Sequence, residues 1–81
     1  MEFEIDPSIE RVKVYGNHQI LDIGYDKKKE TLFIRFHNDS VYQYKPVPEN
    51  MWADFKKSES KGKYFFKHIK NNSNFKTQKR T

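Results

Sequence analysis

Hydrophobic and polar residues alternate through the middle of the chain, and this alternation predicts β-strands. Three segments show it, at residues 20–25, 31–37 and 41–45. Successive side chains of a strand point to opposite faces. The expected buried positions of the first two segments are Leu21, Ile23, Tyr25, Leu32, Ile34 and Phe36. Polar turns separate the segments, and the second, Asn38-Asp39, is expected as a two-residue hairpin turn. The pattern predicts an antiparallel meander of three or more strands.

The segment 9–15 fits two structures. Ile9 and Val12 suit one turn of a helix, whereas Val12 and Val14 alternate as in a strand. We favour the strand. Residues 1–19 are therefore interpreted as an N-terminal extension that can add strands to the meander.

Two helices are expected after the third strand. Pro46 and Pro48 end that strand, because proline cannot donate a ladder hydrogen bond. Apolar residues then recur at helical spacing, at Met51, Trp52 and Phe55. Ser60 suits the N-cap of a second short helix. The inner stripe of that helix is expected at Phe65, Phe66 and Ile69. The predicted fold class is α+β: a small antiparallel β-meander packed against two short α-helices.

With 81 residues the chain has room for one domain. We place it at residues 20–76 and expect residues 77–81 to form a basic disordered tail. The chain contains no cysteine, so neither a disulfide nor a thiolate metal site is available. Aromatic residues make up 16% of the chain and hydrophobic residues 35%, so aromatic rings are expected to form much of the core.

The positive charge is concentrated in the last third of the chain. Residues 1–55 hold 7 Lys/Arg and 10 Asp/Glu, whereas residues 56–81 hold 9 Lys/Arg and 1 Asp/Glu. A basic region of this kind attracts phosphates or anionic lipid. It is equally typical of a solubilising surface, and charge alone does not separate the two interpretations.

Tyr42 and Tyr44 stand two apart on the third expected strand, so both rings lie on one face. Exposed strand tyrosines stack nucleobases in single-strand RNA binders. Alternatively the rings pack under the helix that carries Trp52. We favour the core role, because the chain has few aliphatic residues. In an intermediate arrangement the two tyrosine rings are buried and their hydroxyl groups reach the rim of the core.

The second group of candidate binding residues lies in the expected second helix and the turn before it. Phosphates are expected to meet Lys61, Lys63, Lys67 and Lys70, and Tyr64 is a further ring for a base. Ser60-Lys61-Gly62-Lys63 precedes helical residues whose amides could bind an anion, although the spacing is not that of a P-loop. The alternative, which we favour, is that Ser60 caps the helix and Gly62 allows close packing.

Catalysis, a metal site and a cofactor are not expected. The histidines His18, His37 and His68 are scattered, without metal-ligand spacing. No nucleophile elbow is present. Asp22 and Asp26 are expected to be solvated. No run approaches the about 18 apolar residues of a membrane span, and the acidic N-terminus differs from a signal peptide. We therefore expect a cytoplasmic monomer that does not associate with membranes.

The ordered blocks of the chain resemble the KTSC domain family, whose hallmark is a central Tyr-x-Tyr, matched here by Tyr42 and Tyr44. The other blocks are Ile23-Gly24-Tyr25-Asp26, Leu32-Phe33-Ile34-Arg35-Phe36, Val47-Pro48, Ser60-Lys61-Gly62-Lys63-Tyr64-Phe65 and His68-Ile69-Lys70. The resemblance extends over about residues 20–75. That family is named for the C-terminal extension of some bacterial lysyl-tRNA synthetases and also occurs as small free-standing proteins of bacteria and phages.

The resemblance implies the fold, and through the fusion to a tRNA synthetase it implies RNA binding. The family usually has Asn at the position of Phe66; if that Asn contacts a ligand in other members, the contact is missing here. We expect a small non-catalytic binding module that holds RNA or another nucleic acid through its basic helix and aromatic rings. The alternative is a module that binds a protein or a small phosphorylated ligand such as a nucleotide.

Overall fold

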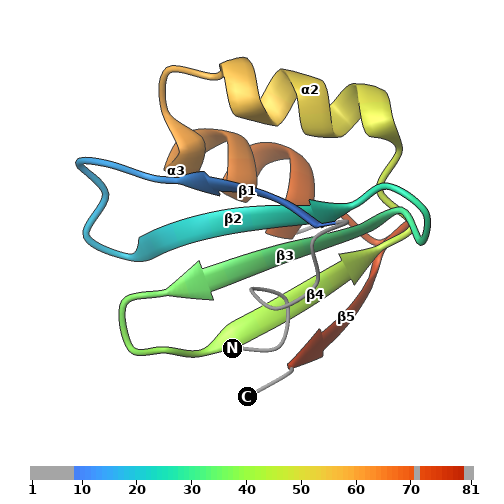
Figure 1. The fold of residues 1–81 in the computed structure, drawn as a ribbon, viewed down its shortest axis with the longest axis horizontal. Coiled ribbons are helices and arrows are strands. Elements are labelled where there is room, and N and C mark those ends of the chain that lie inside the picture. Colours follow the sequence, from blue (N-terminus) through green and yellow to red (C-terminus); the bar gives the residue numbers. More distant parts are fainter. Residues whose placement is uncertain (1–8, 71, 80–81) are drawn as a thin grey trace.

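A single antiparallel sheet with helices on one face forms the domain (Figure 1). The computed structural model describes residues 9–70 and 72–79. Within them the strands lie in sequence order: β1 (Ile9–Lys13), β2 (Ile20–Asp26), β3 (Thr31–Phe36), β4 (Val41–Lys45) and β5 (Lys76–Lys79). The helical elements are α2 (Glu49–Lys57), α3 (Lys61–Tyr64) and its π-helical continuation η1 (Phe65–Lys70). The α+β meander with helices is confirmed.

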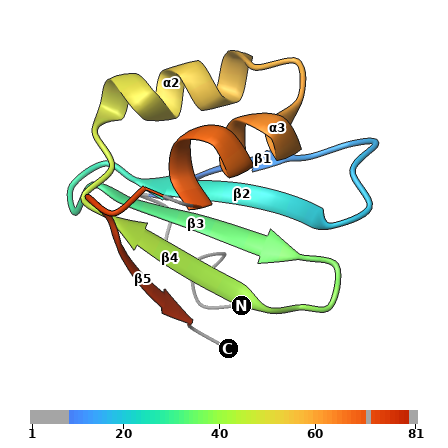
Figure 2. The ribbon, with the colours of Figure 1, turned by 180° about the vertical axis from the view of Figure 1, so that it is seen from behind.

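The strand register places most of the alternating residues as the sequence predicts. The prediction that Leu21 is buried is wrong: the register shifts between Ile20 and Asp22, so Ile20 enters the core at 1% exposure and Leu21 is only half-buried. Ile34 pairs with Ile23 on β2 and with Tyr42 on β4, and Leu32 pairs with Tyr44. These side chains face α2, α3 and η1, which lie over the same face of the sheet in Figure 1 and in the reverse view of Figure 2. The main core is formed by Val14, Ile20, Ile23, Tyr25, Leu32, Ile34, Tyr44, Val47, Trp52, Phe55, Phe65 and Ile69.

Residues 9–13 form an edge strand, as the alternation of Val12 and Val14 predicts. β1 pairs antiparallel with β2, with Val12 opposite Ile23. The strand therefore extends the sheet beyond the three predicted strands. Residues 1–8, the remainder of the expected N-terminal extension, lie outside the described residues.

The expectation of a frayed tail from residue 77 is wrong for residues 77–79, which belong to β5. This strand pairs antiparallel with β4, with Thr77 opposite Tyr44 and Lys79 opposite Tyr42. All four β5 side chains are exposed. β5 is held by backbone pairing with β4, which would otherwise be an unprotected edge of the sheet. Because none of its side chains is buried, the strand shows no hydrophobic pattern in the sequence. Residues 80–81 lie outside the described part of the chain.

The β3–β4 connection is longer than the predicted two-residue turn. The Asp39 amide donates to the Phe36 carbonyl and the Phe36 amide donates to the Ser40 carbonyl, each at 2.9 Å. The loop thus runs from His37 to Asp39. Asp39 adopts a left-handed conformation with φ 68°. This is a turn followed by a left-handed residue, the usual form of a three-residue hairpin loop.

The prediction that Asp22 and Asp26 are solvated is wrong. Asp22 is 3% exposed, and its two carboxylate oxygens accept from Arg35 Nε at 3.1 Å and Nη2 at 2.6 Å. The two residues are cross-strand partners of β2 and β3. Asp26 is also buried, and its Oδ1 accepts from the amides of Lys28 and Lys29. Sequence spacing did not reveal the Asp22–Arg35 pair, because pairing across strands depends on register, whereas the partners of Asp26 are amides of the turn that follows it.

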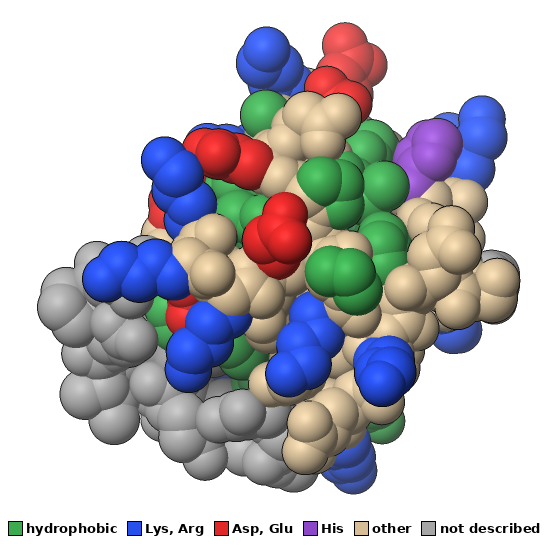
Figure 3. All heavy atoms as spheres, turned by 90° about the vertical axis from the view of Figure 1, so that its right-hand side faces the viewer, with side chains coloured by type: hydrophobic (Ala, Val, Ile, Leu, Met, Phe, Trp, Pro, Cys, Tyr) green, Lys and Arg blue, Asp and Glu red, His purple; other side chains and the backbone are tan. Residues whose placement is uncertain are grey.

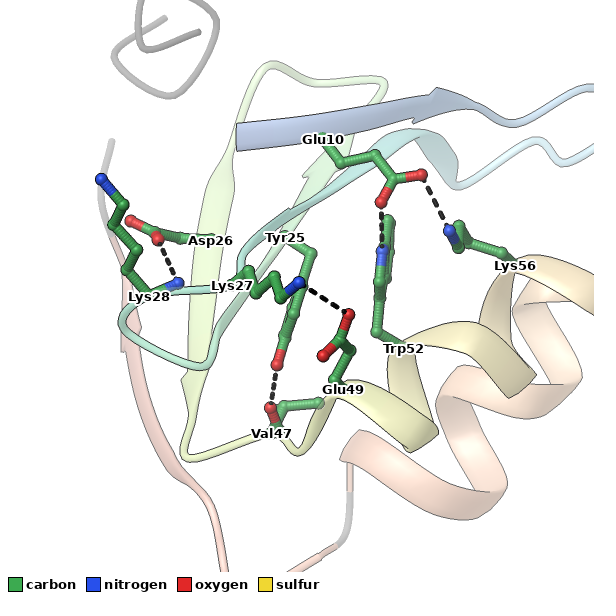
Figure 4. A network of polar contacts seen from close by, with 9 residues as sticks. All are labelled: Glu10, Tyr25, Asp26, Lys27, Lys28, Val47, Glu49, Trp52 and Lys56. Carbon is green, nitrogen blue, oxygen red and sulfur yellow. Dashed lines mark hydrogen bonds and ion pairs between the residues drawn. The ribbon is translucent and has the colours of Figure 1, made fainter. Parts of the chain in front are cut away.

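A polar contact joins β1 to α2 (Figure 4). Glu10 accepts a hydrogen bond from Trp52 Nε1 at 2.9 Å and another from Lys56 Nζ at 2.8 Å. The hydrogen bond from Lys56, and then that from Trp52, hold the pKa of the Glu10 carboxyl below its ordinary value of 4.5. A carboxyl whose pKa is lower in the folded state stabilises the fold at pH values above its unfolded pKa.

Replacing Glu10 by glutamine is therefore expected to lower the unfolding free energy at pH 7 by less than about 1 kcal/mol, because the ion pair is solvent-exposed. The difference from the parent protein should shrink as the pH falls from about 4.5 through the lowered folded-state pKa, where the carboxyl becomes protonated. Urea unfolding of both proteins at pH 7 and pH 3 measures this difference in unfolding free energy. Glu59→Gln, in the loop between α2 and α3, is the matched control. An equal loss of stability in E10Q at both pH values would contradict the stabilising role assigned to the ionised Glu10 carboxylate.

Candidate ligand-binding grooves

A groove of about 590 Å³ opens between the β1–β2 loop, the β3–β4 loop and η1. It is lined by His18, Gln19, Phe36, His37, Asn38, Ser40, Tyr42, Tyr44, Phe65, Phe66 and Lys70. The Tyr-x-Tyr strand and the basic helical segment, about twenty residues apart in the sequence, therefore meet in one groove. We refer to it as the first groove.

The two tyrosines of β4 differ in their exposure. Tyr44 is 5% exposed and packs edge-on against Phe65, with ring centroids 5.7 Å apart. Burial raises the pKa of its phenol. Tyr42 is only half-buried and packs edge-on against Phe36 at 5.7 Å. Tyr44 is thus a core residue at the floor of the first groove, whereas part of Tyr42 remains accessible.

Phe66 projects from η1 with 43% of its surface exposed. The prediction that it belongs to the inner stripe is wrong. Phe65 and Ile69 face the core, and Phe66, the residue after Phe65, is turned away from that side of the helical element. The Lys70 ammonium lies 4.6 Å from the centre of the Phe66 ring. The groove therefore presents an accessible ring beside a positive charge.

A second groove, also of about 590 Å³, lies on the other side of Phe66. His18, Gln19 and Phe66 line both grooves, so the two are adjacent. The further lining residues of the second groove are Asn17, Ser60, Gly62, Lys63 and Lys67. Six of the eight predicted binding residues line one of the two grooves: Tyr42, Tyr44, Ser60, Lys63, Lys67 and Lys70.

Ser60 and Gly62 have the structural roles that we favoured. Ser60 Oγ accepts from the Lys63 amide at 3.3 Å, which caps α3. A Cβ on Gly62 would lie 2.6 Å from Asn17 Nδ2. Glycine at this position therefore allows the β1–β2 loop to approach α3. Of the helix N-terminal amides considered for anion binding, that of Lys63 is already partnered by Ser60 Oγ.

Lys61 and Tyr64 connect α3 to α2 and line neither the first nor the second groove. Lys61 Nζ donates to the carbonyls of Lys56 at 2.9 Å and Ser58 at 2.8 Å, which satisfies backbone acceptors at the end of α2. Tyr64 stacks on Phe55 with centroids 5.1 Å apart. Burial raises the pKa of the Tyr64 phenol. Both side chains thus serve the packing of the helices.

Histidines of two loops border the grooves. His37 Nε2 lies 2.9 Å from the Asn17 carbonyl, and the His37 amide donates to the Gln19 carbonyl at 2.9 Å. These bonds join the β1–β2 and β3–β4 loops at the groove wall. Among residues 9–70 and 72–79 no group of three or more His, Cys, Asp or Glu is placed to hold a metal ion.

The fold and grooves define a small α+β domain with a concave basic and aromatic surface at one end of its sheet. The KTSC domain model matches residues 17–75, and the chain belongs to the KTSC domain family. The resemblance seen in the ordered sequence blocks is therefore confirmed.

Two relatives are informative. A KTSC domain protein of Yersinia pestis has a crystal structure that matches with a TM-score of 0.79 and 36% sequence identity, covering 90% of this chain and 99% of that chain. A lysine–tRNA ligase of Nostoc punctiforme is 39% identical over 56 residues, which are 69% of this chain. The match spans only 10% of the length of the ligase.

In the described part of the chain no helix is both long and apolar enough to cross a membrane.

Proposed function

We propose that this domain is a non-catalytic nucleic-acid-binding module, with RNA as its first ligand. The observation that carries the proposal is the pair of adjacent grooves, in which Lys63, Lys67 and Lys70 lie around the accessible rings of Phe66 and Tyr42. Lysine side chains attract phosphates without regard to sequence. Accessible rings stack on bases, which every nucleotide presents. The relation to part of a lysine–tRNA ligase supports RNA over DNA.

The grooves lie at one end of the molecule, and the opposite end offers a comparison. Figure 3 faces the end that carries the β2–β3 turn and the start of α2, where basic, acidic and hydrophobic side chains are interspersed. Lys27 of that turn lies 3.5 Å from Glu49. The β2–β3 turn therefore also carries lysines, but the positive charge of Lys27 is partly balanced by the carboxylate of Glu49.

A small phosphorylated ligand such as a nucleotide is the second candidate. The volume of the first groove, about 590 Å³, falls within the range of small-molecule sites, about 300–1,000 Å³. Its floor is aromatic and Lys70 stands at its wall. Thermal unfolding with added nucleotides tests this candidate, because a ligand that binds the native state raises Tm. A flat result together with a captured protein would favour a protein-binding module.

The proposal predicts RNA binding that weakens steeply with salt. Fluorescence anisotropy with labelled single-stranded RNA and tRNA, at 50 and 200 mM salt, measures it. Replacing Lys63, Lys67 and Lys70 by alanine is expected to reduce the slope of log K against log salt by up to about 2, at about 0.7 for each lost phosphate contact on a single strand.

The matched control removes three lysines at the other end of the domain, Lys27, Lys28 and Lys29, which are exposed in the β2–β3 turn. This variant loses the same formal charge. It is expected to keep most of the salt slope. The absence of RNA binding at 50 mM salt, or equal losses in both triple variants, would refute the proposal.

A further inference from the structure

The concave surface continues past the second groove towards the β1–β2 loop. A third hollow, of about 290 Å³, is lined by residues of that loop and by Glu59, Ser60 and Lys61. It shares Asn17 and Ser60 with the second groove. Since the second groove shares His18, Gln19 and Phe66 with the first, the three hollows adjoin one another and make up one row. We call it the end path, running from Tyr15 in the third hollow to Tyr42 in the first.

The two large hydrophobic side chains exposed in the described residues both lie on this path. They are Tyr15, 82% exposed, and Phe66, 43% exposed. Tyr15 lines the third hollow, and Phe66 stands at the junction of the first and second. Both residues therefore keep accessible ring faces, and accessible aromatic rings can stack on nucleobases.

Tyr15 is held on an ordered loop. The next residue, Gly16, has φ 74°, a conformation that favours glycine. Asn17 Oδ1 then accepts from the amides of Gln19 and Ile20, each at 2.8 Å. The loop also contacts α3 closely, since a Cβ on Gly62 would meet Asn17. The backbone next to Tyr15 is therefore fixed relative to the helix that carries the lysines.

Basic side chains occupy the path between the two rings. Lys63 and Lys67 line the second groove together with Phe66, and Lys70 lies over Phe66. Glu59 is the one acidic side chain among the lining residues of the three hollows. The three hollows thus combine the two exposed rings with lysines, and Lys13 and Lys61 line the third hollow together with Tyr15.

Building on the proposed function, we propose that the end path binds a single strand of nucleic acid and discriminates against duplex. One base stacks on Phe66 and another on Tyr15, and the phosphates between them lie at Lys63 and Lys67. A duplex keeps its bases stacked inside and cannot offer a free face to either ring. The domain measures 26 × 25 × 21 Å, which limits the path to on the order of four nucleotides, the lower end of the site sizes known for OB folds.

The test compares the full chain with Phe66→Ala and Tyr15→Ala on an oligouridine octamer and on a blunt RNA duplex with eight base pairs. Each alanine substitution is expected to weaken octamer binding by about 5- to 150-fold, since one base stack is lost. Duplex binding should be weaker than octamer binding for the parent chain and unchanged in both variants. Phe66→Tyr retains a ring and should restore octamer binding. Thermal unfolding of each variant verifies that it is folded.

The outcomes separate this inference from the proposed function. If octamer and duplex bind equally and both alanine variants bind like the parent, the single-strand path is overturned while nucleic-acid binding stands. If only Phe66→Ala weakens binding, the path over Tyr15 is overturned. If neither RNA binds at 50 mM salt, the proposed function fails and this inference fails with it.

Discussion

Phe55→Ala is expected to lower the free energy of unfolding by about 3–5 kcal/mol, the usual cost of removing a buried phenylalanine ring. Phe55 is fully buried, stacks on Tyr64 and meets Trp52 edge-on at 6.3 Å. Its loss leaves a cavity where α2 packs against α3. A domain of this size loses about 4–8 °C of Tm for each kcal/mol, so we expect a decrease of at least about 12 °C by calorimetry or circular dichroism.

Phe66→Ala provides the matched control for this prediction. It removes the same ring from the neighbouring helical element, but from an exposed position. A substitution at such a surface position usually changes stability by about 0.5 kcal/mol or less. Equal losses of Tm in F55A and F66A would contradict the assignment of Phe55 to the core and of Phe66 to the surface.

Arg35→Met is expected to destabilise the domain by a similar amount, about 3–5 kcal/mol, because it leaves a buried carboxylate without its guanidinium. The side chain of Asp22 is 5% exposed and that of Arg35 is 16% exposed. Two hydrogen bonds join them across β2 and β3. Urea unfolding at pH 7 measures the change.

Two comparisons test the reason for this effect. The double variant Asp22→Leu with Arg35→Met removes both charges and should recover most of the lost stability, because paired apolar replacements are often nearly neutral. Lys27→Met breaks an exposed pair with Glu49 and should cost at most about 1 kcal/mol. If the double variant were as unstable as Arg35→Met, the isolated carboxylate would not be the cause.

Local patterns predicted much of the fold because the sheet is a meander. Neighbouring strands are joined by short loops, so the alternation that identifies each strand also fixes which face is buried. Leu32, Ile34 and the two β4 tyrosines lie on the helix side as this rule requires. The rule failed for β5, which has four exposed side chains and pairs with β4 after the helices intervene.

The candidate site was only partly predictable. Lys63, Lys67 and Lys70 stood out by charge, and Tyr42 by the resemblance to the KTSC family. His18, Gln19 and His37 carried no signal, because the groove brings two loops together that are separated along the chain. Phe66 had a weak signal: of two adjacent phenylalanines in a short helix, one must lie off the buried stripe.

The sequence by itself determined strands β1 to β4, the helical segments and the KTSC family, because these follow from side-chain periodicity and from local blocks of residues, whereas β5 does not. Only the tertiary structure decided what each polar or aromatic side chain meets. It assigned Lys61 to the end of α2, Tyr64 to the ring of Phe55, and Asp22 to Arg35. It also left Phe66 exposed on the path that connects the grooves. The physical reason is that such contacts join segments far apart in the chain, and their energies depend on register and burial, which local periodicity does not specify.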